Sequence, residues 1–238
     1  MESKNNKIAL LVDGDNAQAK VLEDILEEAS KYGKVTIRRV YGDWTTPQMN
    51  HWKSLLNEMA FNPIQKFSYT TGKNSTDSAL IIDAMDILHD QSVDGFCIVS
   101  SDSDYTGLAK RIREEGIFVM GIGEQKTPAA FVKSCEIFTY VENLDSKSDS
   151  GEKKAEVKKS KEKTVNKKLI NKAFDMSINE SNEAYVSTLG INLRKLDPSF
   201  DVRSYGCKTL TQFFSQLPQY KVMDNVVNGI NNPILKKK

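Results

Sequence analysis

A continuous apolar run, Ile8–Val12, ends at an acidic turn and is followed by an amphipathic helix. Such a run is typical of a strand in a parallel sheet that is covered on both faces. The same order returns at Gly95–Val99, which precedes the polar turn Ser100–Asp104 and a helix that starts at Tyr105. Strands that alternate with helices predict an α/β domain with a mainly parallel sheet.

The rest of the first 144 residues continues this alternation. Apolar residues at helical spacing predict further helices over residues 21–33, 47–61, 77–89 and 129–132. Short apolar runs predict further strands over residues 35–41, 64–69, 116–123 and 137–141. Asn16 is placed to cap the first helix, because its side chain can accept a hydrogen bond from the first helical turn.

The net charge of +1 conceals two halves of opposite sign. Residues 1–144 contain 15 Lys and Arg against 21 Asp and Glu, whereas residues 145–238 contain 18 against 11. The Lys-rich segment 145–163 has no aromatic residue and cannot bury a core, so it predicts a flexible linker. Its basicity fits a solvated tether better than a specific binding arm. We therefore expect two domains, residues 1–144 and 164–238, with a polyanion as a partner of the second.

The second domain has the pattern of three short helices followed by two strands. Apolar residues at helical spacing mark helices within 169–174, 186–196 and 210–217. Tyr220–Met223 and Pro233–Leu235 predict a terminal β-hairpin. This order predicts a small winged-helix domain.

Four carboxylates are expected at one edge of the sheet. Asp13, Asp102 and Asp104 follow the ends of two strands, where ligands bind in open α/β sheets. Asp77 projects onto the apolar face of its helix, where an unpaired carboxylate is costly. Simpler roles remain open for these residues, namely helix capping for Asp102 and Asp104 and a buried ion pair for Asp77.

Carboxylates that converge repel one another unless a cation lies between them. Hard oxygen ligands without a nearby His or Cys favour Mg²⁺ or Mn²⁺ over zinc. Such ions activate water and stabilise both oxygens of an in-line displacement at phosphorus. The residues themselves therefore predict metal-dependent phosphoryl or phosphodiester chemistry.

Three motifs resemble the NYN domain family, which contains LabA-like proteins of the PIN-like nuclease superfamily. They are Leu11–Asn16, Thr76–Asp83 and Ser100–Tyr105, and they occur in the order of the family. The resemblance covers about residues 6–144. It implies a PIN-like, Rossmannoid α/β fold with a mainly parallel sheet flanked by helices, and Mg²⁺- or Mn²⁺-dependent cleavage of RNA.

The resemblance also assigns roles to single residues. The catalytic and metal-binding acids that it implies are Asp13, Asp77, Asp102 and Asp104. It implies that Asn16 and Ser101 position metal-bound water or the scissile phosphate, and that Lys73 contacts a phosphate.

Residues from Thr164 to about Lys238 resemble the OST-HTH, or LOTUS, domain, and Leu196–Leu210 carries the resemblance. Members bind RNA, and some bind helicase partners, so RNA and a protein partner are both expected for this domain. Tyr205 and Lys208 are the signature positions for substrate binding. Tyr205 is equally consistent with a core or turn residue.

Two other functions remain open beside the ribonuclease. Asp13 and Asp15 have the spacing of the D-x-D nucleophile motif of haloacid-dehalogenase-type phosphatases, although Asn16 and Ala17 fit that motif poorly. A non-catalytic RNA-binding adaptor with the same fold is the other alternative. The ribonuclease and the phosphatase would both act on a bond to phosphorus. They differ in substrate, which is RNA for the first and a phosphate monoester for the second.

The expected location is the cytoplasm, without contact with a membrane. The first residues lack the apolar segment of a signal peptide, and no stretch approaches the roughly 20 apolar residues of a membrane span. The three cysteines are odd in number and show no C-x-x-C spacing, which fits reduced, buried thiols. The oligomeric state is not indicated by the sequence.

Overall fold

The computed structural model describes residues 6–67, 75–144, 165–227 and 229–238. The chain divides into two compact units, Met1–Ser150 and Gly151–Lys238, and each is described by itself. The predicted linker, residues 145–163, and the phosphate contact predicted at Lys73 lie outside the described residues.

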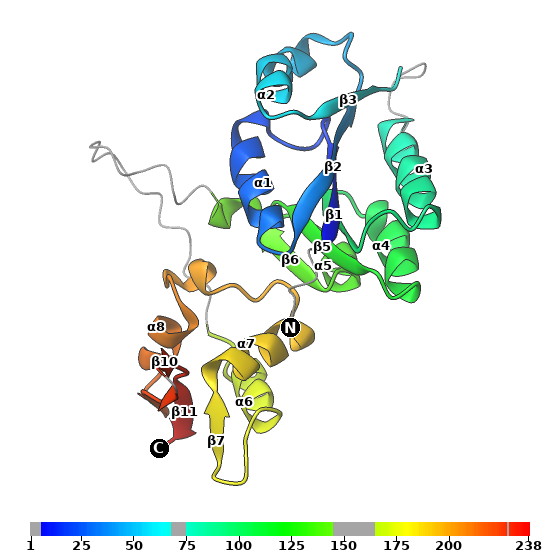
Figure 1. Cartoon of the computed structure of the whole chain (residues 1–238). Helices are drawn as coiled ribbons and strands as arrows, with labels where there is room; N and C mark the ends of the chain where they lie inside the picture. The colour runs from blue at the N-terminus through cyan, green and yellow to red at the C-terminus, as the bar shows by residue number, and fades with distance from the viewer. Residues whose placement is uncertain (1–5, 68–74, 145–164, 228) are drawn as a thin grey trace, which may run out of the picture. The chain divides into compact units, whose positions relative to one another are not determined.

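A six-stranded sheet forms the centre of the first unit (Figure 1). Its strand order is β3-β2-β1-β4-β5-β6, and every neighbouring pair is parallel. The strands are β1 (Lys7–Asp13), β2 (Lys34–Gly42), β3 (Asn62–Gln65), β4 (Gly95–Val99), β5 (Phe118–Gly123) and β6 (Ile137–Tyr140). The predicted α/β class with a mainly parallel sheet is therefore confirmed.

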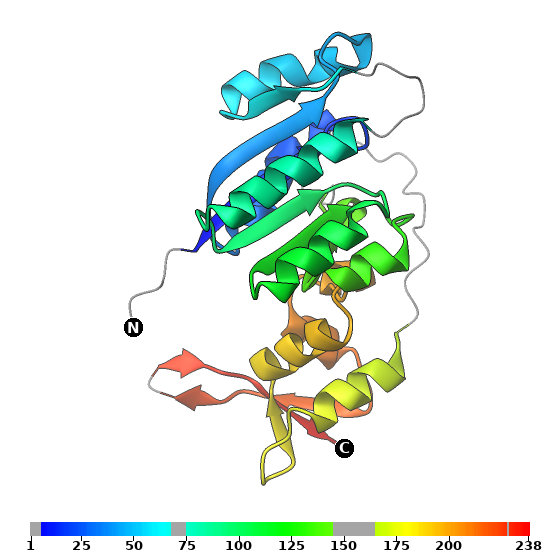
Figure 2. The same cartoon turned by 90° about the vertical axis from the view of Figure 1, so that its right-hand side faces the viewer.

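Helices cover both faces of this sheet, as Figures 1 and 2 show. One face carries η1 (Ala19–Val21), α1 (Leu22–Ser30), η2 (Pro47–Trp52) and α2 (Lys53–Glu58). The other face carries α3 (Ser75–His89), α4 (Tyr105–Glu114) and α5 (Ala129–Ser134). A short 3-10 helix, η3 (Val141–Asn143), follows β6.

The helix predicted over residues 47–61 begins as the 3-10 helix η2 and ends at Glu58. Met49 and Trp52 are both buried in the core. Residues three apart lie on the same side of a 3-10 helix, so this geometry turns both side chains inward. Ala60 then adopts a left-handed conformation with φ of 54°, which ends the helix before β3.

Alternate side chains of β1 enter two separate cores. Leu10 and Val12 pack on the side of α1, whereas Ala9 and Leu11 pack on the side of α3 and α4. Asp13 is the next residue of the second series, so the pleat directs its side chain toward α3 and α4. β1 and β4 are neighbours at the point where the strand order reverses, which is where open α/β sheets bind ligands.

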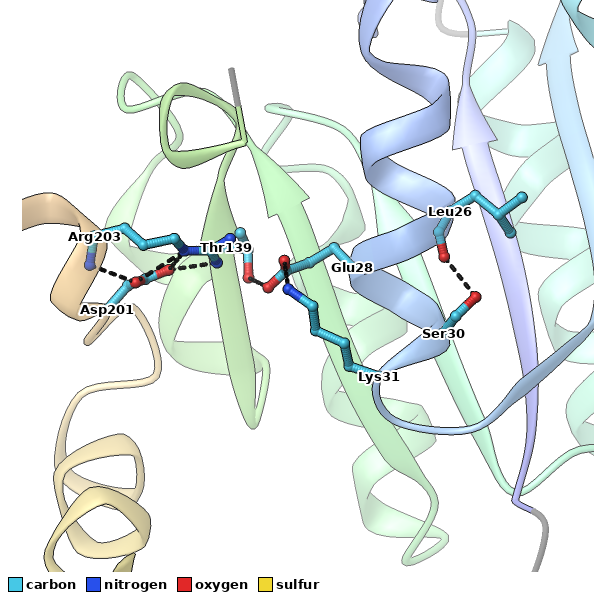
Figure 3. A network of polar contacts seen from close by, with 7 residues as sticks. All are labelled: Leu26, Glu28, Ser30, Lys31, Thr139, Asp201 and Arg203. Atoms are coloured by element: carbon cyan, nitrogen blue, oxygen red, sulfur yellow. Dashed lines mark hydrogen bonds and ion pairs between the residues drawn. The ribbon is translucent and has the colours of Figure 1, made fainter. Parts of the chain in front are cut away.

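One charged side chain is buried on the side of α1 (Figure 3). Glu28 accepts hydrogen bonds from Lys31 Nζ at 2.6 Å and from Thr139 Oγ1 at 3.3 Å. Because a buried carboxylate needs partners, these contacts satisfy Glu28 and join α1 to β6. We assign this network to the stability of the fold and not to the site.

In its described residues, the second unit combines three α-helices with a three-stranded antiparallel sheet of order β7-β11-β8. Its elements are α6 (Lys167–Asp175), β7 (Glu183–Tyr185), α7 (Val186–Leu196), η5 (Val202–Tyr205), α8 (Leu210–Ser215), β8 (Tyr220–Met223), β9 (Val226–Val227), β10 (Ile230–Asn231) and β11 (Ile234–Lys237). The predicted small C-terminal domain is present, and β8 pairs with β11 as the expected hairpin. The sequence did not predict β7, because a strand of three residues with one buried side chain is too short to show the alternation of apolar and polar residues.

The three cysteines lie buried as free thiols. Burial raises the pKa of Cys135 to about 12, so this thiol stays protonated and packs as a small apolar group. Within the described residues, no helix combines the length and the apolar composition that crossing a membrane requires.

Candidate active site

Asp13 is the most deeply buried acid of the site, with 0% of its surface exposed. Its Oδ2 accepts hydrogen bonds from Asn16 Nδ2 at 2.7 Å and from Ser100 Oγ at 3.0 Å, and the Tyr105 hydroxyl lies 3.2 Å from the same oxygen. Its Oδ1 accepts a hydrogen bond from the backbone N–H of Asp15 at 3.3 Å. Three donors from the turns after β1 and β4, with the Tyr105 hydroxyl beside them, therefore hold this carboxylate in one orientation.

The turn after β1 that positions Asp13 requires a glycine. The N–H of Gly14 donates to the carbonyl of Tyr41 at 2.8 Å, which draws the turn against the end of β2. A β-carbon added at Gly14 would lie 2.7 Å from that carbonyl oxygen. Any larger residue would push the turn, and the acid before it, away from β2.

Burial raises the pKa of Asp13, and the negative charge of Asp77 raises it further. The hydrogen bonds from Asn16 and Ser100 act in the opposite direction, because they stabilise the ionised form. A buried carboxylate beside other acids is energetically strained without a cation nearby. A cation bound near Asp13 would therefore stabilise its ionised form.

Asp77 lies in the first turn of α3, with 8% of its surface exposed. The hydroxyl of Tyr105, the first residue of α4, donates to Asp77 Oδ1 at 2.7 Å. Tyr105 is fully buried, and the same hydroxyl lies 3.2 Å from Asp13 Oδ2. Tyr105 therefore stands between the two acids and fixes their separation.

Asp102 and Asp104 come from the turn between β4 and α4. Ligand oxygens of Asp77, Asp102 and Asp104 lie within 4.8 Å of one another. Ser100 Oγ accepts the N–H of Asp102 at 3.1 Å, and Asp102 Oδ1 accepts the N–H of Asp104 at 3.0 Å. The serine that contacts Asp13 thus also shapes the turn that presents the two outer acids.

This group suits a hard divalent cation. The three side chains offer only carboxylate oxygens, and they range from the buried Asp77 to the exposed Asp104. Mg²⁺ prefers such ligands, and it usually keeps several waters, which the open side of the group can accommodate. Burial raises the pKa of Asp77, and the charges of Asp102 and Asp104 add to the effect. A bound cation would remove this repulsion.

A hydrogen bond ties the turn after β1 to the start of α3. Thr76 Oγ1 donates to Asp15 Oδ2 at 2.7 Å. Thr76 directly precedes Asp77, so this contact holds the beginning of α3 close to the turn that contains Asp13. The three motifs found in the sequence therefore meet at the carboxyl edge of the sheet.

The NYN domain model matches residues 7–144, which is more than half of the chain. The chain belongs to the NYN domain family. A second model, of the OST-HTH/LOTUS domain, matches residues 158–231. NYN domains are PIN-like nucleases, and OST-HTH domains bind RNA. Both resemblances found in the sequence are thereby confirmed.

Individual relatives of the NYN domain add little about activity. The uncharacterized protein MJ0482 of Methanocaldococcus jannaschii is 29% identical over 125 residues, which cover 50% of this chain and 48% of that protein. The alignment therefore spans about half the length of the relative. Among solved structures, a protein of unknown function from Vibrio parahaemolyticus, VPA0982, is similar with a TM-score of 0.49 and 23% identity over 59% of this chain and 96% of that one. MurG of Acinetobacter baumannii is similar with a TM-score of 0.38 and 12% identity over 57% and 41%.

Asn16 and Ser101 lie at the same edge of the sheet as the acids, with contacts that the sequence did not predict. Asn16 does not cap the first helix, because η1 begins at Ala19 and Gln18 occupies the capping position. Its amide instead donates to Asp13. Ser101 Oγ accepts the N–H of Glu124 at 2.9 Å and so supports the turn after β5.

Tyr205 and Lys208 lie in the other unit, on and after η5. The Tyr205 ring packs against Phe213 and Phe200, with centroid distances of 5.0 and 6.0 Å, and burial raises the pKa of its hydroxyl. The side chain of Lys208 is exposed. Of the two signature residues, Lys208 is thus the one whose side chain is open to a ligand.

Three residues that organise the NYN site carry no role in the sequence-based prediction. There Ser100 belongs to a polar turn, Tyr105 starts a helix and Thr76 is part of a family motif. A signal existed for Tyr105, because a buried tyrosine needs a partner for its hydroxyl, and the acids nearby were the available acceptors. No pattern in the sequence indicated which of Ser100 and Ser101 would face Asp13.

We expect Asp77→Asn to leave the stability of the metal-free NYN domain unchanged or to raise it at pH 7. The folded-state pKa of Asp77 is raised above 3.8, so the folded protein binds this proton more tightly than the unfolded chain does. The resulting loss of stability begins as the pH rises above about 3.8 and is complete above the raised pKa. The substituted asparagine has no such loss and can still accept the Tyr105 hydrogen bond.

The measurement is thermal unfolding in EDTA from pH 4 to pH 7 for both proteins. The difference in melting temperature should grow toward pH 7, and added Mg²⁺ should stabilise the variant less. A sharp drop in the melting temperature of metal-free Asp77→Asn at pH 7 would show that Asp77 serves a structural ion pair.

Proposed function

We propose that the protein is a divalent-metal-dependent ribonuclease that cleaves RNA phosphodiester bonds and holds RNA through its C-terminal domain. The observation that carries the proposal is the group formed by Asp77, Asp102 and Asp104, with the buried Asp13 directly behind it. Membership of a PIN-like nuclease family supports the reaction class.

Asp77, Asp102 and Asp104 are the residues that would hold Mg²⁺ or Mn²⁺. When bound, such an ion supplies an activated water and stabilises the developing charge at phosphorus. Asp13 contributes negative charge behind Asp77 and is joined to it through the Tyr105 hydroxyl.

The other residues of the site fix these acids before substrate binds. Ser100 connects Asp13 to the backbone of Asp102, and Tyr105 connects Asp13 to Asp77. Catalytic groups that are preorganised in this way need no rearrangement during the reaction. Asn16 is exposed beside Asp13, and we assign it to the contact between this network and the substrate. Ser101 and Lys73 remain proposed substrate contacts of the same edge.

The OST-HTH domain supplies the attraction for RNA that the acidic NYN domain lacks. Residues 145–238 contain 18 Lys and Arg against 11 Asp and Glu, whereas the first 144 residues have an excess of acids. Phosphate neutralisation by basic side chains dominates nucleic-acid affinity. We propose Lys208 as a phosphate contact and Tyr205 as the residue that supports the surrounding surface.

The alternatives make different use of the same residues. A phosphatase of the haloacid-dehalogenase type would need Asp13 as an accessible nucleophile, but this carboxylate is fully buried, accepts three hydrogen bonds and lies beside the Tyr105 hydroxyl. An RNA-binding adaptor would have no use for a close group of acids. Such a group repels itself, and also RNA, unless a bound cation balances its charge, so its presence disfavours the adaptor.

The decisive test is to incubate the full chain with labelled single-stranded and double-stranded RNA in Mg²⁺, in Mn²⁺ and in EDTA. We expect cleavage products with either metal and none in EDTA. A phosphate monoester serves as the control substrate and should not be hydrolysed. RNA binding without cleavage under every condition would favour the adaptor, and turnover of the monoester alone would favour the phosphatase.

A further inference from the structure

A hollow of about 380 Å³ opens beside the turn that follows β1. Its walls include Asp15, Gln18, Gln48, Met49, His51 and Trp52. Met49 and Trp52 belong to the core on the side of α1, so the hollow lies across the end of β1 from the acidic group. Its volume falls in the range of about 300 to 1,000 Å³ that is usual for small-molecule sites.

The lining disfavours a phosphate and favours a neutral ligand that has hydrogen-bonding groups along its edge. It contains the carboxylate of Asp15 but no Lys or Arg. Gln48 and His51 are exposed, and their side chains make no hydrogen bond to any other described residue. Each can both donate and accept. Met49 and Trp52 are buried and close the apolar floor of the hollow, while the exposed polar groups at its rim match the hydrogen-bonding edge of a nucleobase.

Asp15 connects this hollow to the acidic group. Its Oδ2 accepts the hydroxyl of Thr76, the residue before Asp77. A β-carbon added at Gly42 would lie 2.4 Å from Met49 Cε and 3.6 Å from Asp15 Oδ1. The second oxygen of Asp15 therefore lies beside Gly42 and Met49, and both Asp15 and Met49 line the hollow. One carboxylate thus borders both the hollow and the segment that carries Asp77.

We propose that the hollow is a nucleobase subsite for the nucleotide next to the scissile phosphate, and that Asp15 makes it prefer adenine, cytosine and guanine over uracil. The inference names the base of the substrate and so rests on the proposed function. An exocyclic amino group donates a hydrogen bond to a carboxylate. Uracil presents a single N–H between two carbonyls, and the carbonyl oxygens repel a carboxylate.

The test is equilibrium binding of 2′-O-methyl trinucleotides UXU to the full chain in EDTA, with X as each of the four bases. We expect the three amino-bearing bases to bind about 10- to 100-fold more tightly than uracil, which corresponds to one hydrogen bond to a charged group. Asp15→Asn should remove this preference, because its amide can also donate to a uracil carbonyl. The substituted side chain keeps an oxygen that can accept the Thr76 hydroxyl, so the turn is preserved.

Two further variants separate the subsite from other binding. Gln48→Ala and His51→Ala should each weaken all four trinucleotides by about 2- to 5-fold, since each loses a neutral hydrogen bond. Asp86→Asn, a change of an exposed acid on α3, should leave the preference intact. A preference that originates in the C-terminal domain would survive Asp15→Asn, and this result would overturn the proposal.

The assay contains no metal and scores no cleavage, so its outcome is independent of the nuclease test. Equal binding of all four bases overturns the subsite even where the protein cleaves RNA. A preference that depends on Asp15 supports the subsite even where no cleavage occurs, and in that case only the proposed reaction is disproved.

Discussion

Asp102→Asn is expected to slow RNA cleavage by at least about 100-fold while leaving the fold intact. A lost metal ligand removes several kcal/mol of transition-state stabilisation, and each 1.4 kcal/mol, roughly, is a factor of ten in rate. The side-chain oxygen of the substituted asparagine can still accept the N–H of Asp104, so the turn after β4 keeps its hydrogen bond. The free energy of unfolding should therefore change by less than about 0.5 kcal/mol.

The measurement is single-turnover cleavage of labelled RNA in Mg²⁺, together with urea unfolding of each protein. Asp86→Asn is the matched control, because it removes the same charge from the exposed side of α3 and should retain full activity. Unchanged cleavage by Asp102→Asn, or cleavage by the unaltered protein in EDTA, would contradict a metal-dependent site.

Asp13→Asn should also nearly abolish cleavage, but with an added loss of stability. Asp13 receives donors at both of its oxygens, whereas an asparagine has only one oxygen to offer. In either orientation its amide N–H faces another donor, which costs about 1–3 kcal/mol for a buried group. Asp102 is therefore the better position at which to test the chemistry alone.

Removal of residues 145–238 is expected to raise the RNA concentration for half-maximal cleavage by about 10- to 100-fold while the rate at saturation stays unchanged. In the proposed function the C-terminal domain holds RNA near the acidic NYN domain, so its loss would remove a high effective concentration of substrate. Each unit has its own buried core, so each should fold when separated.

The measurement combines steady-state kinetics of fragment 1–144 on short RNA with fluorescence anisotropy of fragment 164–238. The affinity of the second fragment should fall steeply with salt, because counterions are released when phosphates are neutralised. Lys208→Gln in the full chain should reproduce part of the effect. An unchanged half-saturating concentration, together with no RNA binding by fragment 164–238, would indicate that this domain serves a protein partner.

The arrangement of the sheet could be predicted because its signals are local. β1 and β4 are short apolar runs that end in polar turns, and each is followed by a helical stripe that starts at a definable residue. The burial of Asp77 was also predictable, since 100° per residue places it on the apolar face of α3. These features depend on neighbours within about ten residues.

The contacts inside the site could not be predicted in the same way. Asn16 was expected to cap a helix, because its position before an amphipathic segment fits that role. In the structure its side-chain amide instead donates a hydrogen bond to the charged carboxylate of Asp13. The choice between Ser100 and Ser101 depends on the exact residue at which β4 ends. Such choices are set by the tertiary structure, which the local pattern does not contain.

The bonds around Asp13 have a consequence for when the site exists during folding. Ser100 and Tyr105 are 87 and 92 residues away from Asp13 along the chain. Closing loops of this length has an entropic cost that only the finished pairing of β1 with β4 can offset. Partly synthesised or partly unfolded chains should therefore lack the assembled acids, so that an RNA-cleaving activity would emerge only after the central strands have paired.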